Sequence, residues 1–171
     1  MIQCVERRRL FFALWPDDVI RAGIVARREK LGRASRRQVP DHNLHLTLLF
    51  LGDQPADRVD AIKASSGQIE AETCKLILNH LDWFPSARVA WLGGEAPAEL
   101  DALATALKSA MAPLGLIFDV RPFRPHITLF RQVRQRPHFP EIEPLEWPVT
   151  EFALVESIPG QPYQVLRKWG V

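Results

Sequence analysis

The chain has 171 residues, of which 47% are hydrophobic and 25% charged, a composition typical of one globular domain. No apolar stretch approaches the roughly 20 residues that span a bilayer, so the composition argues against a membrane protein. Two cysteines are too few for a disulfide framework, and a formal net charge of +2 does not identify a partner by itself. The apolar run after Arg9 is short and meets Pro16 at once, so no secretory signal is expected. We therefore expect reduced thiols and a cytoplasmic protein.

The hydrophobic patterns and turn residues predict an alternating series of strands and helices. In chain order they predict a strand at 9–15, a helix at 16–32, a basic loop at 33–43, a strand at 44–52, a helix at 54–72, strands at 73–84 and 87–94, a helix at 96–115, an arginine-bearing connection at 116–125, a strand at 126–131, a proline-rich segment at 133–148, and strands at 151–158 and 163–171. The strands at 73–84 and 87–94 are expected to pair with each other. The proline-rich segment is expected to lie outside the core.

A coarse repeat divides the chain. Each half contains a helix, then a basic loop with proline, then a strand that opens with His-x-Thr-Leu, and the two histidines, His45 and His126, are 81 residues apart. The repeat predicts an α+β fold with two similar lobes, whose antiparallel sheets face a central cleft and whose helices lie outside. We expect residues 1–171 to form a single bilobal domain.

The histidine and threonine of each motif are two residues apart on a strand, so they should point to the same face. His45 is thus expected to project with Thr47, and His126 with Thr128. The alternate positions are expected to face the core: Leu44, Leu46, Leu48 and Phe50 in the first strand, and Ile127 and Leu129 in the second.

Two imidazoles beside one phosphate suit phosphodiester cleavage, because a neutral histidine can accept a proton while a protonated histidine donates one. Threonine hydroxyls can donate hydrogen bonds to the non-bridging phosphate oxygens. This chemistry requires no metal and no cofactor. A metal site built from Asp41, His42 and His45 is not expected, because residues three apart on a strand do not share a face.

Basic residues gather next to both motifs. Between Arg21 and Arg37 there are seven basic residues and one acidic residue, and between Arg121 and Arg136 there are five arginines and no acidic residue. A solvated basic surface would explain either run alone, whereas two runs beside the motifs favour a polyanionic partner. Arg121 and Arg124 are candidates for contact with an RNA backbone, and Phe12 for stacking on a base, although a core position suits Phe12 as well.

The paired motifs resemble those of the 2H phosphoesterase superfamily. The segments "RLFFALWPDD", "VPDHNLHLTLLFLG", "FRPHITLFR" and "LVESIPGQPYQVLRKWGV" are similar to the RNA 2′,3′-cyclic phosphodiesterases, also described as 2′-5′ RNA ligases. The similarity runs from about Arg9 to Trp169. It implies a bilobal α+β fold, hydrolysis of a terminal RNA 2′,3′-cyclic phosphate to a 2′-phosphate, and reversible, ATP-independent 2′-5′ ligation. It further implies RNA ends, tRNA fragments among them, as substrates of a monomeric enzyme.

The resemblance also implies roles for single residues. His45 would donate a proton to the 3′ leaving oxygen, His126 would accept one from water, and Thr47 and Thr128 would contact the phosphate. Arg131 matches a family arginine five residues after the second histidine. In an ideal strand Arg131 points away from His126, so it reaches the phosphate only if the strand ends or bulges near Phe130.

Two other functions are compatible with the same residues. One is a module that binds a nucleotide or RNA with little turnover. The other is a 2H phosphodiesterase for a different substrate: a small cyclic nucleotide, ADP-ribose 1″,2″-cyclic phosphate or a linear RNA 3′ end. The arginine-rich loops favour a longer RNA.

Overall fold

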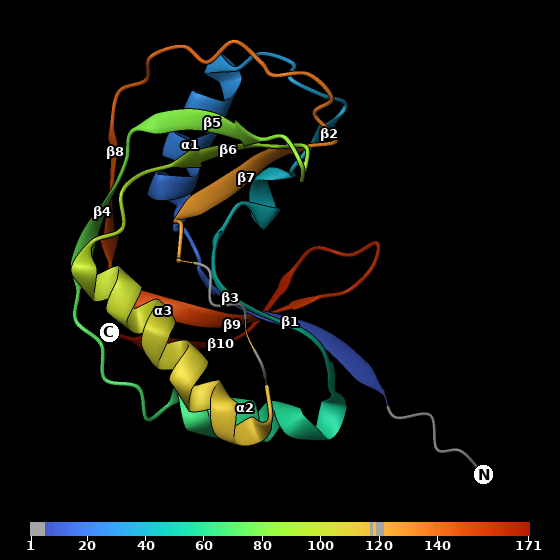
Figure 1. The fold of residues 1–171 in the computed structure, drawn as a ribbon, viewed down its shortest axis with the longest axis vertical. Helices are drawn as coiled ribbons and strands as arrows, with labels where there is room; N and C mark the ends of the chain where they lie inside the picture. Colours follow the sequence, from blue (N-terminus) through green and yellow to red (C-terminus); the bar gives the residue numbers. More distant parts are fainter. Residues whose placement is uncertain (1–5, 117, 119–121) are drawn as a thin grey trace.

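The fold is described from a computed structural model, which covers residues 6–116, 118 and 122–171. It is an α+β structure in which all strand pairs are antiparallel within the described residues (Figure 1). None of the helices described there is long and apolar enough to cross a membrane.

Eight strands form the main sheet, in the order β10-β9-β1-β3-β7-β6-β5, with β2 paired to β7. Their bounds are β1 Arg7–Leu14, β2 Arg37–Gln38, β3 Leu46–Pro55, β5 His80–Phe84, β6 Val89–Gly93, β7 His126–Arg131, β9 Glu151–Ser157 and β10 Gln164–Gly170. A second sheet contains β4 (Cys74–Leu78) and β8 (Leu145–Val149). Where β3 meets β7, one residue pair, Leu46 with Ile127, joins the strands within the described chain. The main sheet is thus nearly divided into two parts, β10-β9-β1-β3 and β7-β6-β5.

The helices are α1 (Asp18–Lys30), α2 (Val59–Ser66) and α3 (Ala98–Met111), with short 3₁₀ turns η1 (Asp41–Asn43), η2 (Ala56–Arg58) and η3 (Ala112–Leu114). α1 begins where the Asp17 carboxylate accepts a hydrogen bond from the backbone N–H of Ile20, at 2.8 Å. α1 packs against β6 and β8, whereas α3 packs against β3 and β4. α1 therefore covers the part of the sheet that holds His126, although it precedes His45 in the chain, and α3 covers the part that follows His45, although it precedes His126. The two structural parts are thus not the two halves of the chain.

The core follows the apolar pattern of the sequence. The buried face of α3 consists of Leu100, Leu103, Leu107 and Met111, at the spacing expected for a helix, together with Ala104. Leu44, Leu46, Leu48, Ile127 and Leu129 are buried as predicted. Burial of one such side chain stabilises the fold by about 1.5–3 kcal/mol, so the strands that carry both motifs are firmly anchored.

Phe50 differs from its prediction, because its side chain is 48% exposed. In the pairing of β1 with β3, Ala13 lies opposite Thr47 and Phe12 opposite Leu49, so Leu48 is an extra residue in β3. This β-bulge shifts the alternation by one position. Leu49 therefore faces the core, and Phe50 faces outward.

Three further predictions differ from the structure. The segment 73–84 is not one strand, because β4 and β5 separate at Asn79 and only β5 pairs with β6. β4 pairs instead with β8, inside the proline-rich segment expected to lie outside the core, where Trp147 is 5% exposed. The helix predicted at 54–72 extends only over 59–66.

Candidate active site

The two histidines are held in the same way. The Nδ1 atom of His45 lies 2.7 Å from the carbonyl oxygen of Asn43, and Nδ1 of His126 lies 2.8 Å from that of Arg124. A carbonyl oxygen only accepts hydrogen bonds, so Nδ1 carries the hydrogen in both rings. In each neutral imidazole the Nε2 atom is then the unprotonated nitrogen. Both motifs thus fix the same tautomer by a hydrogen bond to the residue two positions earlier.

The register between β3 and β7 brings the motifs together. Leu46 pairs with Ile127, and each follows a motif histidine directly. In an antiparallel pair this register, extended by one residue, sets His45 opposite Thr128 and His126 opposite Thr47. The two histidines and the two threonines therefore lie together where the two parts of the main sheet pair through β3 and β7.

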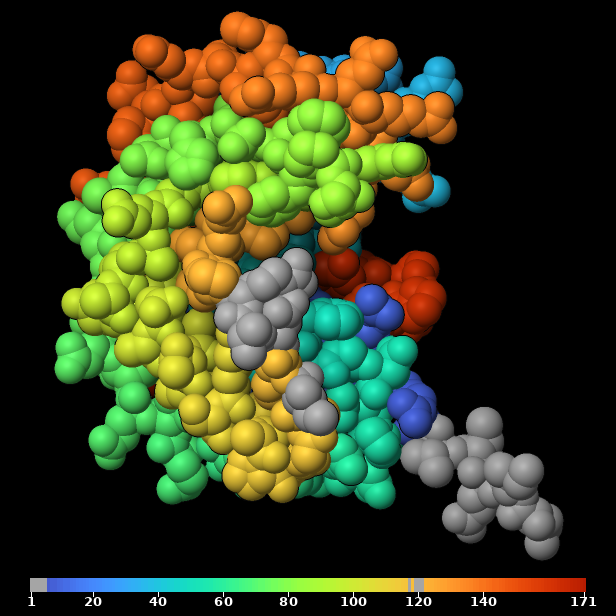
Figure 2. Space-filling view, in the orientation of Figure 1, coloured from blue at the N-terminus to red at the C-terminus, as the bar shows by residue number. Residues whose placement is uncertain are grey.

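A cavity of about 180 Å³ opens beside this point, and its lining includes His45, Thr128, Arg131 and Tyr163 but not His126 or Thr47. His45 directly precedes β3, Thr128 and Arg131 lie on β7, and Tyr163 lies in the turn between β9 and β10. Figure 2 shows the surface hollowed between β5–β7 and the β9–β10 turn.

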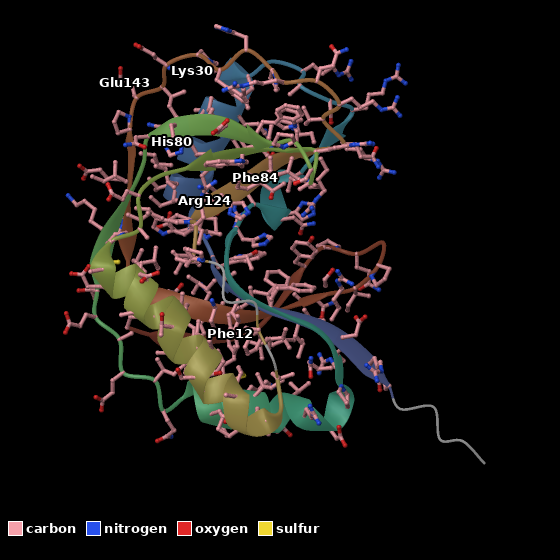
Figure 3. All side chains as sticks on the ribbon, viewed as in Figure 1. Phe12, Lys30, His80, Phe84, Arg124 and Glu143 are labelled. Atoms are coloured by element: carbon pink, nitrogen blue, oxygen red, sulfur yellow. The ribbon has the colours of Figure 1, made fainter. Side chains whose placement is uncertain are left out.

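His126 is placed by a close approach of two strands. Gly93, at the end of β6, pairs with His126, and a Cβ atom there would lie 2.8 Å from the carbonyl oxygen of Pro125. Only glycine fits this approach without a shift of the backbone. The rings of Phe84 and Trp91 lie edge-on to the His126 ring, with centroids 5.2 and 6.0 Å away. Figure 3 shows Phe84 and Arg124 near each other on this side of the molecule.

Both imidazoles are easier to keep neutral than histidine in water. Burial, together with the neighbouring Arg131, His126 and Arg21, lowers the pKa of His45 to about 4, against the opposing hydrogen bond to Asn43. Burial also lowers the pKa of His126, with smaller contributions from Arg124 and Arg131. Both rings are therefore neutral at pH 7 before an anion binds.

Thr47 contacts its motif partner directly. Its Oγ1 atom lies 3.0 Å from Nε2 of His45. Because Nε2 is unprotonated in the neutral ring, the hydroxyl donates this hydrogen bond. Protonation of Nε2 would make the same nitrogen a donor and release the threonine hydrogen for another acceptor.

β7 contains the bulge that Arg131 needs in order to point to the same side as His126 and Thr128. In the pairing of β6 with β7, Trp91 lies opposite Thr128 and Ala90 opposite Phe130, so Leu129 is an extra residue in β7. This bulge restores the parity that an ideal strand would deny. Arg131 lines the same cavity as His45 and Thr128.

The prediction that Phe12 stacks on an RNA base is wrong. Its side chain is fully buried and packs edge-on against Phe152, so no base can stack on it. Its neighbour Phe11 lies on the His45 side instead, with its ring centroid 4.8 Å from that of His45. Arg124 is exposed, with its guanidinium 5.9 Å from the centre of the Phe84 ring. Arg121 lies outside the described residues.

Several residues of the site were missed by the sequence analysis. Trp15 stacks on the His45 ring at 5.9 Å, and Tyr163 meets it edge-on at 5.5 Å. The Oδ1 atom of Asn43 accepts a hydrogen bond of 2.9 Å from the backbone N–H of Tyr163. Asn43 thus ties the β9–β10 turn to the histidine that its own carbonyl holds. A usable signal was that Tyr163 is the only tyrosine of the chain.

The first basic run is partly structural. The Arg28 guanidinium is buried and contacts the Asp41 carboxylate at 2.6 Å, while Arg21 donates to the carbonyl oxygens of Asp41 and Leu44. Arg33, Arg36 and Arg37 remain exposed. Within the described residues, no group of three or more His, Cys, Asp or Glu side chains is placed to hold a metal ion.

Comparison with known proteins identifies the family of this chain. The model of the 2′-5′ RNA ligase superfamily matches residues 15–160. The chain belongs to this superfamily. It is 35% identical over 173 residues to RNA 2′,3′-cyclic phosphodiesterase of Escherichia coli (strain K12), covering 97% of this chain and 98% of that protein. Its identity to the Thermus thermophilus protein of the same name is 36% over 181 residues, covering 95% and 90%.

Solved structures of similar sequence share the fold. A crystal structure of E. coli LigT complexed with 3′-AMP matches with a TM-score of 0.85 at 35% identity, covering 97% of this chain and 99% of that one. Both His-x-Thr motifs lie inside the range matched by the superfamily model, whereas Tyr163 lies beyond its end.

Proposed function

We propose that this chain is an RNA 2′,3′-cyclic phosphodiesterase, which opens a terminal cyclic phosphate to leave a 2′-phosphate. The proposal depends on one observation. His45 and His126 have the same tautomer and lie at the beginning of two paired strands, and each histidine lies opposite the threonine of the other motif. The full-length relatives that bear this name support the substrate class.

In the proposed reaction a water molecule attacks the phosphorus atom, and the bond from phosphorus to the 3′ oxygen breaks. Nε2 of His126 accepts the proton of the water, and Nε2 of protonated His45 donates a proton to the 3′ oxygen. The product is a 2′-phosphomonoester with a free 3′ hydroxyl, and exchange with solvent restores the two histidines. Arg131 and the hydroxyls of Thr47 and Thr128 hold the negative charge on the non-bridging oxygens.

In this assignment the bound substrate must raise the pKa of His45, so that its imidazole is protonated. Its pKa of about 4 reflects burial first, and then the positive charges of neighbouring groups such as Arg131 and Arg21. A phosphodiester anion in the cavity opposes those positive charges and favours the imidazolium. As Nε2 gains its proton, the Thr47 hydroxyl is released to donate to the phosphate. Binding and activation of the acid are thus one event.

The proposal includes reversible, ATP-independent joining of RNA ends, in which a 5′ hydroxyl takes the place of water. That hydroxyl attacks the cyclic phosphate and gives its proton to His126, the bond from phosphorus to the 3′ oxygen breaks with a proton from His45, and a 2′-5′ phosphodiester forms. The proposal further includes residues 1–171 as one catalytic unit that acts as a monomer in the cytoplasm, with tRNA fragments among its substrates. A ligation assay without added nucleotide tests the joining reaction. The elution volume in size-exclusion chromatography tests the monomer.

The experiment is hydrolysis of a synthetic RNA that ends in 2′,3′-cyclic phosphate, in the presence of EDTA. Wild-type protein should release only the 2′-phosphate, identified by ³¹P NMR. His45→Ala and His126→Ala should each lower kcat by at least about 10²-fold, the contribution of one general acid or base. The RNA affinity of both variants should fall only modestly. Unchanged turnover in either variant would remove that histidine from the mechanism, and binding without turnover by the wild type would identify a binding module.

The small volume of the cavity favours a second candidate, hydrolysis of a small cyclic nucleotide. The two substrates differ in how many phosphates the protein contacts. Affinity for an extended RNA should fall steeply with salt, because each phosphate contact releases counterions. A flat salt response would favour the small substrate.

A further inference from the structure

A second pocket of about 370 Å³ adjoins the catalytic cavity. Its lining residues are Arg37, Ala87, Arg88, Val89, Arg131 and Gln132, and two of them, Arg37 and Arg131, also line the catalytic cavity. Three of these six lining residues are arginines, and none is acidic.

The arginines are held close together by the backbone. Arg37 and Arg131 lie directly opposite each other in the β2–β7 pair. The Ser35 hydroxyl accepts a hydrogen bond of 2.9 Å from the backbone N–H of Arg37 and donates one of 2.6 Å to the carbonyl oxygen of Arg131. Like charges in directly opposite positions destabilise a sheet. In the described part of the chain, no carboxylate forms an ion pair with Arg37, Arg88 or Arg131.

Backbone strain is concentrated at the same place. Among the described residues, the non-glycine residues with positive φ are Arg88, at 54°, and Gln132, at 57°, and both line this pocket. The left-handed conformation is costly for residues other than glycine and is concentrated at functional sites. The backbone N–H of Val133 donates to the carbonyl oxygen of Arg88 at 2.9 Å, which links the two strained turns.

We propose that this pocket binds the internucleotide phosphate immediately 5′ of the reacting cyclic phosphate. The proposal depends on the function proposed above and specifies its substrate: an RNA of at least two nucleotides, bound through two phosphates. An anion between Arg37, Arg88 and Arg131 removes the like-charge repulsion, and guanidinium groups suit phosphate oxygens. Because Arg131 lines both cavities, it stands between the two phosphates.

Three substrates separate this second phosphate from the reaction itself. They are a nucleoside 2′,3′-cyclic phosphate, the dinucleotide of the same base with the same cyclic end, and that dinucleotide with a neutral methylphosphonate as its internucleotide link. The test variant is Arg88→Gln. Arg58→Gln is the matched control, because it removes the same charge from the residue just before α2, far from β2 (Figure 1).

Wild-type kcat/KM should be about tenfold higher for the charged dinucleotide than for the other two substrates, the value of one charge-assisted hydrogen bond. Arg88→Gln should abolish this advantage and leave the other two rates within about twofold. Arg88→Lys, which keeps the charge, should retain part of the advantage, and Arg58→Gln all of it.

Equal loss on all three substrates, or an unchanged preference for the charged dinucleotide in Arg88→Gln, would overturn the second phosphate site while leaving the proposed function intact. Failure of wild-type protein to hydrolyse any of the three substrates would instead overturn the proposed function.

Discussion

Replacement of His45 by glutamine should remove much of the acid sensitivity of the fold. The pKa of His45 is about 4 in the folded protein, against 6.5 for an unperturbed histidine. Between these values the unfolded chain binds a proton that the folded chain does not. The free energy of unfolding therefore falls as the pH drops from above 6.5 toward 4.

The size of the effect follows from the shift in pKa. Each unit corresponds to about 1.4 kcal/mol, so the full contribution of His45 is about 3 kcal/mol. At pH 4.5 most of it, about 2–3 kcal/mol, has been lost, whereas at pH 7.5 almost none has. Such a loss is a large part of the stability of a typical domain, about 5–15 kcal/mol.

Urea denaturation of the wild type, His45→Gln and His138→Gln at pH 7.5 and 4.5 measures this contribution. His138 is exposed and serves as the matched control. The wild type and His138→Gln should lose about 2–3 kcal/mol more than His45→Gln on acidification. Equal losses in all three proteins would show that the folded state does not hold His45 neutral, and would refute the electrostatic account of the site.

Three further predictions concern pH, positioning and strain. The plot of kcat/KM against pH should be bell-shaped with its maximum below pH 6.5. This profile reports the free enzyme, in which the pKa values of His45 and His126 are both lowered. A maximum above pH 7 would contradict this prediction. Asn43→Ala should lower the free energy of unfolding by about 1–3 kcal/mol and reduce kcat, because the Tyr163 N–H loses its acceptor; Tyr163→Phe, which keeps that N–H, is the control. Arg88→Gly should raise the free energy of unfolding by roughly 0.5–1 kcal/mol, since relief of a left-handed residue outweighs the entropy of glycine; a lower value would mean that the turn is not strained.

The sequence was most informative where a pattern is local. Strand alternation assigned the motif histidines and threonines to one face, and helical spacing identified the buried side of α3. The same rule failed at Phe50, because a β-bulge depends on the partner strand and leaves no mark in a single sequence.

The contents of the site depend on contacts between distant segments. β1 is buried on both faces, with Phe11 4% and Phe12 0% exposed, so its sequence cannot show which ring faces the catalytic side. The hydrogen bond from Tyr163 to Asn43 spans 120 residues. The repeat correctly paired the motifs but not the helices, since α1 covers the part of the sheet that holds the second motif and α3 the part that contains β3.

The central claim is that His45 and His126 act on the same phosphorus atom from opposite sides. A crystal structure of the protein with a nucleoside vanadate, a five-coordinate mimic of the transition state, tests it most directly. The account predicts Nε2 of His45 and Nε2 of His126 each about 3 Å from a different axial oxygen of the vanadium. A vanadate that only one of these imidazoles reaches would contradict it.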